Sequence, residues 1–348
     1  MPTVATRTRA KLLARSKKIK ESQHDSQAAT AVLVPTQALA RWLGVVALLT
    51  VVLIVLGATV RVFEAGLSCP DWPKCYGLWW PFPVDPAFGY TNFQVFLEWF
   101  HRLLAKIVGY GVLIGLAWAW WLRRLNPRPF YLLLVASYAL FMQVLLGGLT
   151  VVLDNVPWSV ALHLGNALIF LAVLTLAVIT ASRPALSKPL LVTRRIEVGL
   201  AVVTGVLFTT ILVGAMVSKS YAGGVCGGLP DCVGQWWPTN DAQQQLHMAH
   251  RGLVLLTVLS IGAWYYLARR AVLPVQQSAR AVVWGLGAQI VLGVTLLYSF
   301  AYYPDYYRAL SVAHLAVATV LWTLVVVAWG KLWFGPKPKG VRAMPLHD

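Results

Sequence analysis

The sequence predicts an all-α membrane protein with eight transmembrane helices, arranged as two tandem four-helix bundles related by internal duplication. Three observations lead to this fold class. Of the 348 residues, 58% are hydrophobic and only 12% are charged, which is too few polar side chains for a water-soluble surface. Long apolar stretches recur along the chain, and the segments that connect them repeat one another.

Eight stretches reach or approach the roughly 20 apolar residues that a helix needs to cross a bilayer. They span residues 39–62, 98–122, 130–152, 159–181, 196–218, 247–268, 281–301 and 310–330. Four of them are interrupted by a histidine, which a helix that faces only lipid would avoid. The eight stretches divide the chain into a basic tail (1–37), an N-terminal four-helix half (38–182), a C-terminal four-helix half (183–330) and a second tail (331–348).

The basic residues alternate between the connections. The net charge is +17, and most of it lies in the two tails and in the connections after the second, fourth and sixth stretches. The other connections hold few basic residues and more acidic ones. This alternation is the positive-inside pattern of membrane proteins, so we expect both termini in the cytoplasm of a multi-pass inner-membrane protein. The positive charge therefore lies on the cytoplasmic side, where the N-terminal tail can contact anionic lipid headgroups, and it does not indicate nucleic-acid binding.

All four cysteines fall in connections that the charge pattern places outside. Cys69 and Cys75 form one C-x5-C pair, and Cys226 and Cys232 form another. An oxidising outer compartment favours a disulfide within each pair, Cys69–Cys75 and Cys226–Cys232. A metal site is the alternative, but neither pair encloses a histidine. The spacing leaves open whether these disulfides are structural or exchange with a redox partner.

The outer connections repeat at a fixed spacing. In each half a Gly-Ala-x-Val segment precedes the cysteine pair, and a Trp-Trp-Pro segment follows it. Further along, a His-Arg pair, a glutamine with a glycine four residues later, and a second histidine also recur in both halves. Four helices return the chain to its starting side, so the two halves have the same topology, as in a parallel repeat. The interior of each bundle offers a place for a cofactor between facing helices.

Four histidines occupy repeat-equivalent positions near the outer ends of the even-numbered helices. They are His101, His163, His250 and His314. A lone buried histidine usually hydrogen-bonds a neighbouring carbonyl, but four at one depth indicate a shared role. Neutral imidazole is a good iron ligand, and two imidazoles from separate helices can hold a haem. Zinc or copper would require more ligands close together.

The residues beside these histidines differ between the halves. Glu98 lies one turn before the first-half ligand, where a carboxylate could act as a base or stabilise positive charge on a substrate. The alternative is a carboxylate favoured in the first turn of a helix. His247 takes this position in the second half, as an interfacial residue or a neighbour of the second haem. Arg102 and Arg251 could pair with haem propionates or with lipid headgroups.

These motifs together resemble the haem A synthase family. The resemblance rests on the E-x-x-H-R element of Glu98, the further helix histidines, the duplicated plan and the paired cysteines. It implies an enzyme, a membrane-bound oxidoreductase that oxidises a methyl group of haem O to a formyl group, giving haem A for terminal cytochrome oxidase. It implies that the substrate haem lies between His101 and His163, with Glu98 as the catalytic carboxylate, and that haem b lies between His250 and His314.

The resemblance has three further implications. The pair Cys69–Cys75 is similar to that of the bacterial branch, where it is linked to activity, which implies a bacterial inner membrane. Haem O synthase and an electron acceptor are the implied partners. The family assigns no role that can be transferred to His247.

Two other functions are compatible with the same ligands. A dihaem b-type electron-transfer protein would use the four histidines but leaves Glu98 without a role. A transporter or haem chaperone would suit the parallel repeat, but no helix is visibly broken at its middle. Glu98 and the family resemblance favour the enzyme.

Overall fold

A computed structural model describes residues 36–183, 192–303 and 306–334 of the chain. Within these ranges the secondary structure is helical, and eight helices are long and apolar enough to cross a membrane. The first spans Thr36–Val62, and the others are α2 (Asn92–Leu122), α3 (Arg128–Val152), α4 (Pro157–Ala181), α5 (Arg194–Lys219), α6 (Ala242–Ala268), α7 (Leu273–Tyr302) and α8 (Tyr307–Phe334). The predicted all-α membrane class and its eight membrane-spanning stretches are therefore confirmed. Most of the two predicted tails lies outside the described residues.

Three helices begin five to eight residues before their apolar stretches, because their first turns contain polar residues that an apolar stretch does not include. Thr91 caps α2, and its side chain and that of Gln94 satisfy each other's backbone N–H groups. Asp241 caps α6 by accepting hydrogen bonds from two backbone N–H groups of the first turn. α7 has no side-chain cap, but a proline fits its first turn because the first backbone N–H groups of a helix have no partner within the helix. A search for apolar runs misses such turns.

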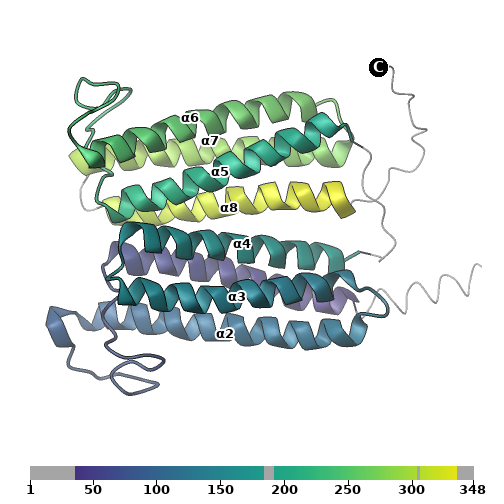
Figure 1. Ribbon diagram of the computed structural model, residues 1–348, viewed down its shortest axis with the longest axis horizontal. Helices are drawn as coiled ribbons and strands as arrows, with labels where there is room; N and C mark the ends of the chain where they lie inside the picture. The colour runs from purple at the N-terminus through teal and green to yellow at the C-terminus, as the bar shows by residue number, and fades with distance from the viewer. Residues whose placement is uncertain (1–35, 184–191, 304–305, 335–348) are drawn as a thin grey trace, which may run out of the picture.

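The helices form two groups that follow the chain order (Figure 1). The closest pairs are the hairpins α3–α4, α5–α6 and α7–α8. The groups meet where α4 packs against α5 and α8. At this boundary the indole of Trp322 donates a hydrogen bond to the carbonyl of Leu168 at 2.9 Å. The division of the chain into two halves stays a prediction.

The first helix packs closely on α2 through small residues. A Cβ added at Gly111 would lie 2.8 Å from a methyl group of Val46, and one at Gly115 would lie 2.8 Å from Leu43. The indole of Trp42 donates to the carbonyl of Gly111 at 2.9 Å. Glycines at helix contacts allow close backbone approach within a membrane, where apolar burial alone does not drive helix association. The core of this group, around Leu43, Val46 and Val112, is correspondingly buried.

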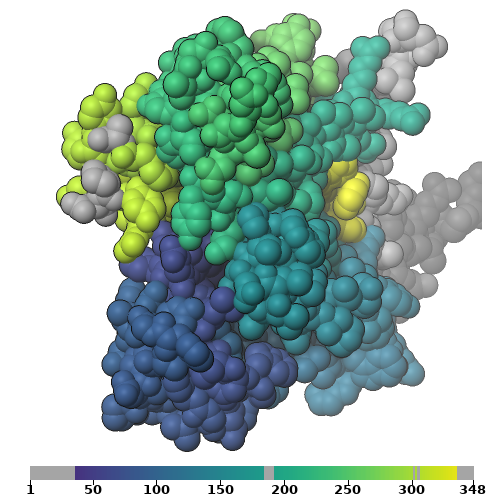
Figure 2. All heavy atoms as spheres, turned by 60° about the vertical axis from the view of Figure 1, so that its left-hand side comes forward, coloured from purple at the N-terminus to yellow at the C-terminus, as the bar shows by residue number. Residues whose placement is uncertain are grey.

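Both disulfide-bearing loops project from the same end of the molecule, the end that comes forward in Figure 2. Their backbones share conformational details, since Glu64 and Tyr221 have positive φ, as do Gly77 and Gly234. The tryptophan pairs that follow the cysteines are exposed in both loops. These matches support the predicted duplication and suit an interfacial aromatic belt.

Candidate functional site

Each of the four predicted ligand histidines packs against a glycine of the preceding helix. A Cβ added to the glycine would lie 2.9–3.1 Å from Cε1 of the imidazole in every case. The pairs are Gly57 with His101, Gly147 with His163, Gly214 with His250, and Gly293 with His314. Real Cβ atoms rarely approach so closely, so a side chain at the glycine would displace the ring. The glycines therefore set how close each imidazole lies to the neighbouring helix.

Glutamines contact the histidines of α4 and α8. The amide nitrogen of Gln143 lies 3.1 Å from Nε2 of His163, and that of Gln289 lies 3.0 Å from Nε2 of His314. Asn166 donates to the side-chain oxygen of Gln143 at 2.6 Å. Val317 stands at the equivalent place in the second half, and the buried side-chain oxygen of Gln289 has no hydrogen-bond partner among the described residues.

The surroundings of the histidines fit haem iron. Nδ1 of His101 is buried and has no hydrogen-bond partner in the described part of the chain. An unpartnered buried imidazole is unfavourable alone, whereas coordination of iron would satisfy one ring nitrogen. Over the described ranges, no three His, Cys, Asp or Glu side chains gather closely enough to hold a bare metal ion. The donor set thus suits a group that brings its own equatorial ligands, as a porphyrin does.

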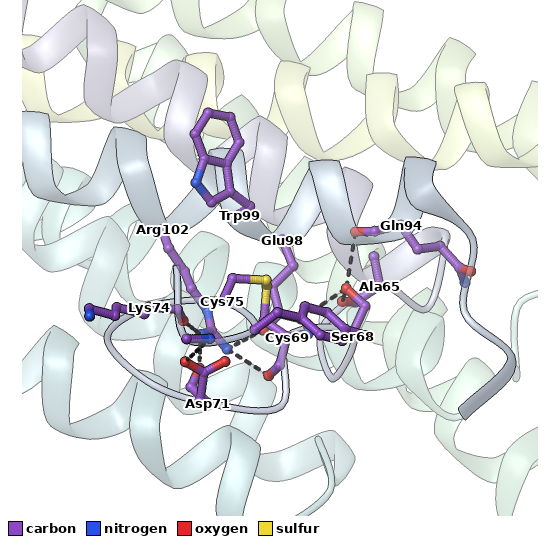
Figure 3. Close-up of a disulfide and its surroundings, with 12 residues drawn as sticks. Ala65, Ser68, Cys69, Asp71, Lys74, Cys75, Gln94, Glu98, Trp99 and Arg102 are labelled. Carbon is purple, nitrogen blue, oxygen red and sulfur yellow. Dashed lines mark hydrogen bonds and ion pairs between the residues drawn. A yellow bond between two sulfur atoms is a disulfide. The ribbon is translucent and has the colours of Figure 1, made fainter. Parts of the chain in front are cut away.

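The carboxylate of Glu98 is buried against the first disulfide loop (Figure 3). Its Oε2 accepts hydrogen bonds from the backbone N–H of Cys69 at 2.7 Å and from the hydroxyl of Ser68 at 3.0 Å. Its Oε1 forms an ion pair with Arg102 at 2.5 Å. Because α2 begins at Asn92, Glu98 lies beyond the first turn, so a preference for the helix N-terminus does not explain it.

The two arginines hold the loops. Arg102 donates to the backbone carbonyls of Cys69, Asp71 and Lys74 in addition to its ion pair with Glu98. Arg251 donates to the carbonyls of Gly228, Pro230 and Asp231 in the second loop. Several bonds from one planar guanidinium fix a loop better than one point charge would. Pairing of these arginines with haem propionates stays a prediction.

His247, in the place of Glu98, also contacts its own loop. Its Nδ1 lies 2.7 Å from the carbonyl oxygen of Ala222, and the side chain is buried. Ala65 is the equivalent of Ala222, and its carbonyl accepts a hydrogen bond from the hydroxyl of Ser68. The two halves therefore connect helix and loop at the same place by different chemistry.

The predicted disulfides are confirmed. Cys69 is bonded to Cys75, and Cys226 to Cys232. In each loop the second cysteine also exchanges two backbone hydrogen bonds with a residue three positions later, Leu78 or Gln235. The second cysteine therefore begins a tight turn in both loops.

The sequence reasoning missed Ser68. Its side chain is 1% exposed, and its hydroxyl reaches Glu98, the carbonyl of Ala65 and the carbonyl of Gln94. An available signal was the comparison of the halves, since the serine and Glu98 occur together in the first half. The second half has Val225 and His247 at the same places.

Comparison with known proteins gives a consistent result. The model of the family described as cytochrome oxidase assembly protein matches residues 40–326. A protein named heme A synthase from Shouchella clausii is 30% identical over 297 residues, which cover 81% of this chain and 93% of that protein. One of the same name from Erythrobacter litoralis is 28% identical over 338 residues, covering 84% of this chain and 96% of its own. With the family model matching most of its length, this chain belongs to the cytochrome oxidase assembly protein family.

Proposed function

We propose that this chain is a haem A synthase, a membrane-bound oxidoreductase that oxidises a methyl group of haem O to a formyl group in successive steps. The observation that carries the proposal is the difference between two otherwise matching histidine sites. Both halves present two imidazoles packed on glycines, but only the first adds a buried carboxylate, Glu98. Relatives named heme A synthase that align over most of the chain support the same function.

The residues divide into a substrate site and a cofactor site. His101 and His163 hold haem O in the first half, and His250 and His314 hold haem b in the second. When bound, haem b supplies one-electron transfer. The packing of α4 against α8, the two helices that carry His163 and His314, supports electron transfer between the two sites.

Glu98 supplies acid–base chemistry to the substrate site. Oxidation of a methyl carbon removes protons as well as electrons, so the site needs a proton acceptor beside the reacting group. Glu98 lies one turn from His101, on the same face of α2. The ion pair with Arg102 and the backbone N–H of Cys69 fix the direction of the carboxylate. A fixed carboxylate can take up the proton without first reorganising.

The setting follows from the same features. The chain works as a multi-pass protein of the bacterial inner membrane, with both termini in the cytoplasm, as the alternation of basic residues supports. Both disulfide loops then face the oxidising outer side. Haem O reaches the first half from haem O synthase, and an electron acceptor draws electrons from the second.

Haem extraction and chromatography test the proposal. The full chain, as wild type, Glu98→Gln and Glu98→Ala, is expressed with a source of haem O, purified and analysed for haems. We expect haem A from the wild type, and haem O or a hydroxylated intermediate from both variants. Two haem b per chain in all three proteins would contradict the enzyme.

Two haem b per chain in the wild type and both variants would instead favour a dihaem b-type electron-transfer protein. One observation favours this second candidate, namely that the histidine, glycine and glutamine contacts are repeated in both halves.

A further inference from the structure

Ser68 touches the proposed catalytic carboxylate and is buried with it. Its hydroxyl oxygen lies 3.0 Å from Oε2 of Glu98, 2.8 Å from the carbonyl oxygen of Ala65 and 3.1 Å from that of Gln94. A hydroxyl carries one hydrogen and two lone pairs. It can therefore donate to only one of these three oxygens at a time, so its hydrogen has alternative positions.

These alternatives match the two states of Glu98. When the carboxylate is ionised, the Ser68 hydroxyl donates to Oε2. When Glu98 has taken up a proton, the Ser68 hydrogen turns to the carbonyl of Ala65 or Gln94, and the Ser68 oxygen accepts the proton of Oε2. Neither state leaves the Ser68 hydroxyl or Oε2 of Glu98 unpaired, which would otherwise cost free energy. Arg102 is the charged group that faces the carboxylate, and it pairs with the other oxygen, Oε1.

The second half provides an internal comparison. Val225 replaces Ser68 there, His247 replaces Glu98, and the carbonyl of Ala222 contacts the imidazole directly. The disulfide and the arginine contacts are nevertheless present in that loop. A hydroxyl is thus not needed to fold such a loop, and it occurs only beside the carboxylate.

We propose that Ser68 is a positioning residue for Glu98, which satisfies the carboxylate in both its protonation states during haem O oxidation. This inference rests on the proposed function. Ser68 acts through Glu98 and does not itself touch the substrate.

The test measures steady-state conversion of haem O by the purified full chain. Ser68→Ala removes the hydroxyl, and Ser68→Thr retains it. Val225→Ala is the matched control, since it shortens the equivalent side chain of the second loop. Loss of one hydrogen bond to a charged group predicts a roughly 10- to 100-fold lower kcat for Ser68→Ala, with KM for haem O little changed. Ser68→Thr should recover most of kcat, and Val225→Ala should match the wild type.

Thiol titration and haem content separate a positioning role from a structural one. Ser68→Ala should keep both disulfides closed and should bind haem as the wild type does. Free thiols or lost haem in this variant would make Ser68 a folding residue and overturn the inference. An unchanged kcat in Ser68→Ala, or a kcat in Ser68→Thr as low as in Ser68→Ala, would also overturn it.

Glu98→Gln distinguishes this inference from the proposed function. Normal conversion of haem O by Glu98→Gln would refute the role of the carboxylate itself, and with it the inference. A slow Glu98→Gln beside a normal Ser68→Ala would refute only the positioning role of Ser68.

Discussion

The hydroxyl of Tyr221 donates a hydrogen bond to Oε1 of Glu64 at 3.0 Å, and the two residues occupy the same place in the two halves, 157 positions apart. Both have positive φ, at 56° and 54°, at the end of the helix that precedes each disulfide loop. The two loop-bearing segments therefore meet through a bond between residues at equivalent places in the sequence repeat.

Removing this bond should have a small effect on stability. Partial burial and then the neighbouring Glu64 raise the pKa of Tyr221, so its hydroxyl stays a donor at neutral pH. Because both groups are exposed, Tyr221→Phe should lower the free energy of unfolding by less than about 1 kcal/mol. Thermal unfolding in detergent measures the change. Tyr138→Phe, which changes an exposed tyrosine on α3, is the control, and a larger loss in Tyr221→Phe would mean that the contact with Glu64 holds the two loop-bearing segments together.

The glycines under the imidazoles should control haem binding. In Gly214→Ala the new Cβ would lie 2.9 Å from Cε1 of His250, the closest of the four approaches. Overpacking of this kind costs about 1–3 kcal/mol, so we expect roughly 5- to 150-fold weaker retention of the second-half haem. Optical spectra and haem content of the purified variant give the result.

Gly148→Ala is the matched control, because nothing lies within 4 Å of its Cβ position. Alanine favours a helix over glycine, so this variant should be neutral or slightly stabilised. If both alanine variants retained haem as the wild type does, the glycines would have no part in placing the ligands.

Much of the fold could be predicted from the sequence because the signals are local or periodic. Apolar length identified the helices, alternating charge along the chain predicted their orientation, and the repeated positions in the two halves singled out the four histidines. The starts of α2, α6 and α7 could not be found in this way, because their first turns contain polar residues, and the capping side chains Thr91 and Asp241 begin only α2 and α6.

The details of the site depend on how the loops fold back. Ser68 and Glu98 are 30 residues apart, and their contact exists only once the disulfide loop lies against α2. The same folding turns Arg102 toward loop carbonyls, a direction that its position beside His101 did not indicate. Comparing the two halves residue by residue would have revealed the pairing of Ser68 with Glu98, but not its geometry.

Exchanging one residue between the halves should change how firmly the glutamine beside a histidine is held. Asn166→Val gives the first half the side chain found at position 317 and removes the hydrogen bond to Gln143. An unpaired buried amide oxygen costs about 1–3 kcal/mol, so the unfolding temperature should fall. The reciprocal Val317→Asn should offer a partner to the side-chain oxygen of Gln289, which has none among the described residues, and should raise the unfolding temperature. Equal changes of the unfolding temperature in the same direction in both variants would contradict this account.

The two disulfides should differ in their importance for activity. Cys69 donates its backbone N–H to Glu98 at 2.7 Å, and the bond to Cys75 closes the loop that carries both this amide and Ser68. The double variant Cys69→Ser/Cys75→Ser should therefore loosen the carboxylate and lower kcat for haem O by about 10-fold or more.

Cys226→Ser/Cys232→Ser is the matched control. Its loop touches His247 through Ala222 and contacts no carboxylate of α6, so conversion should stay close to that of the wild type. Turnover assays with equal haem loading compare the two variants. Equal losses would show that the disulfides support folding alone, whereas a loss confined to the first pair ties that loop to the chemistry of Glu98.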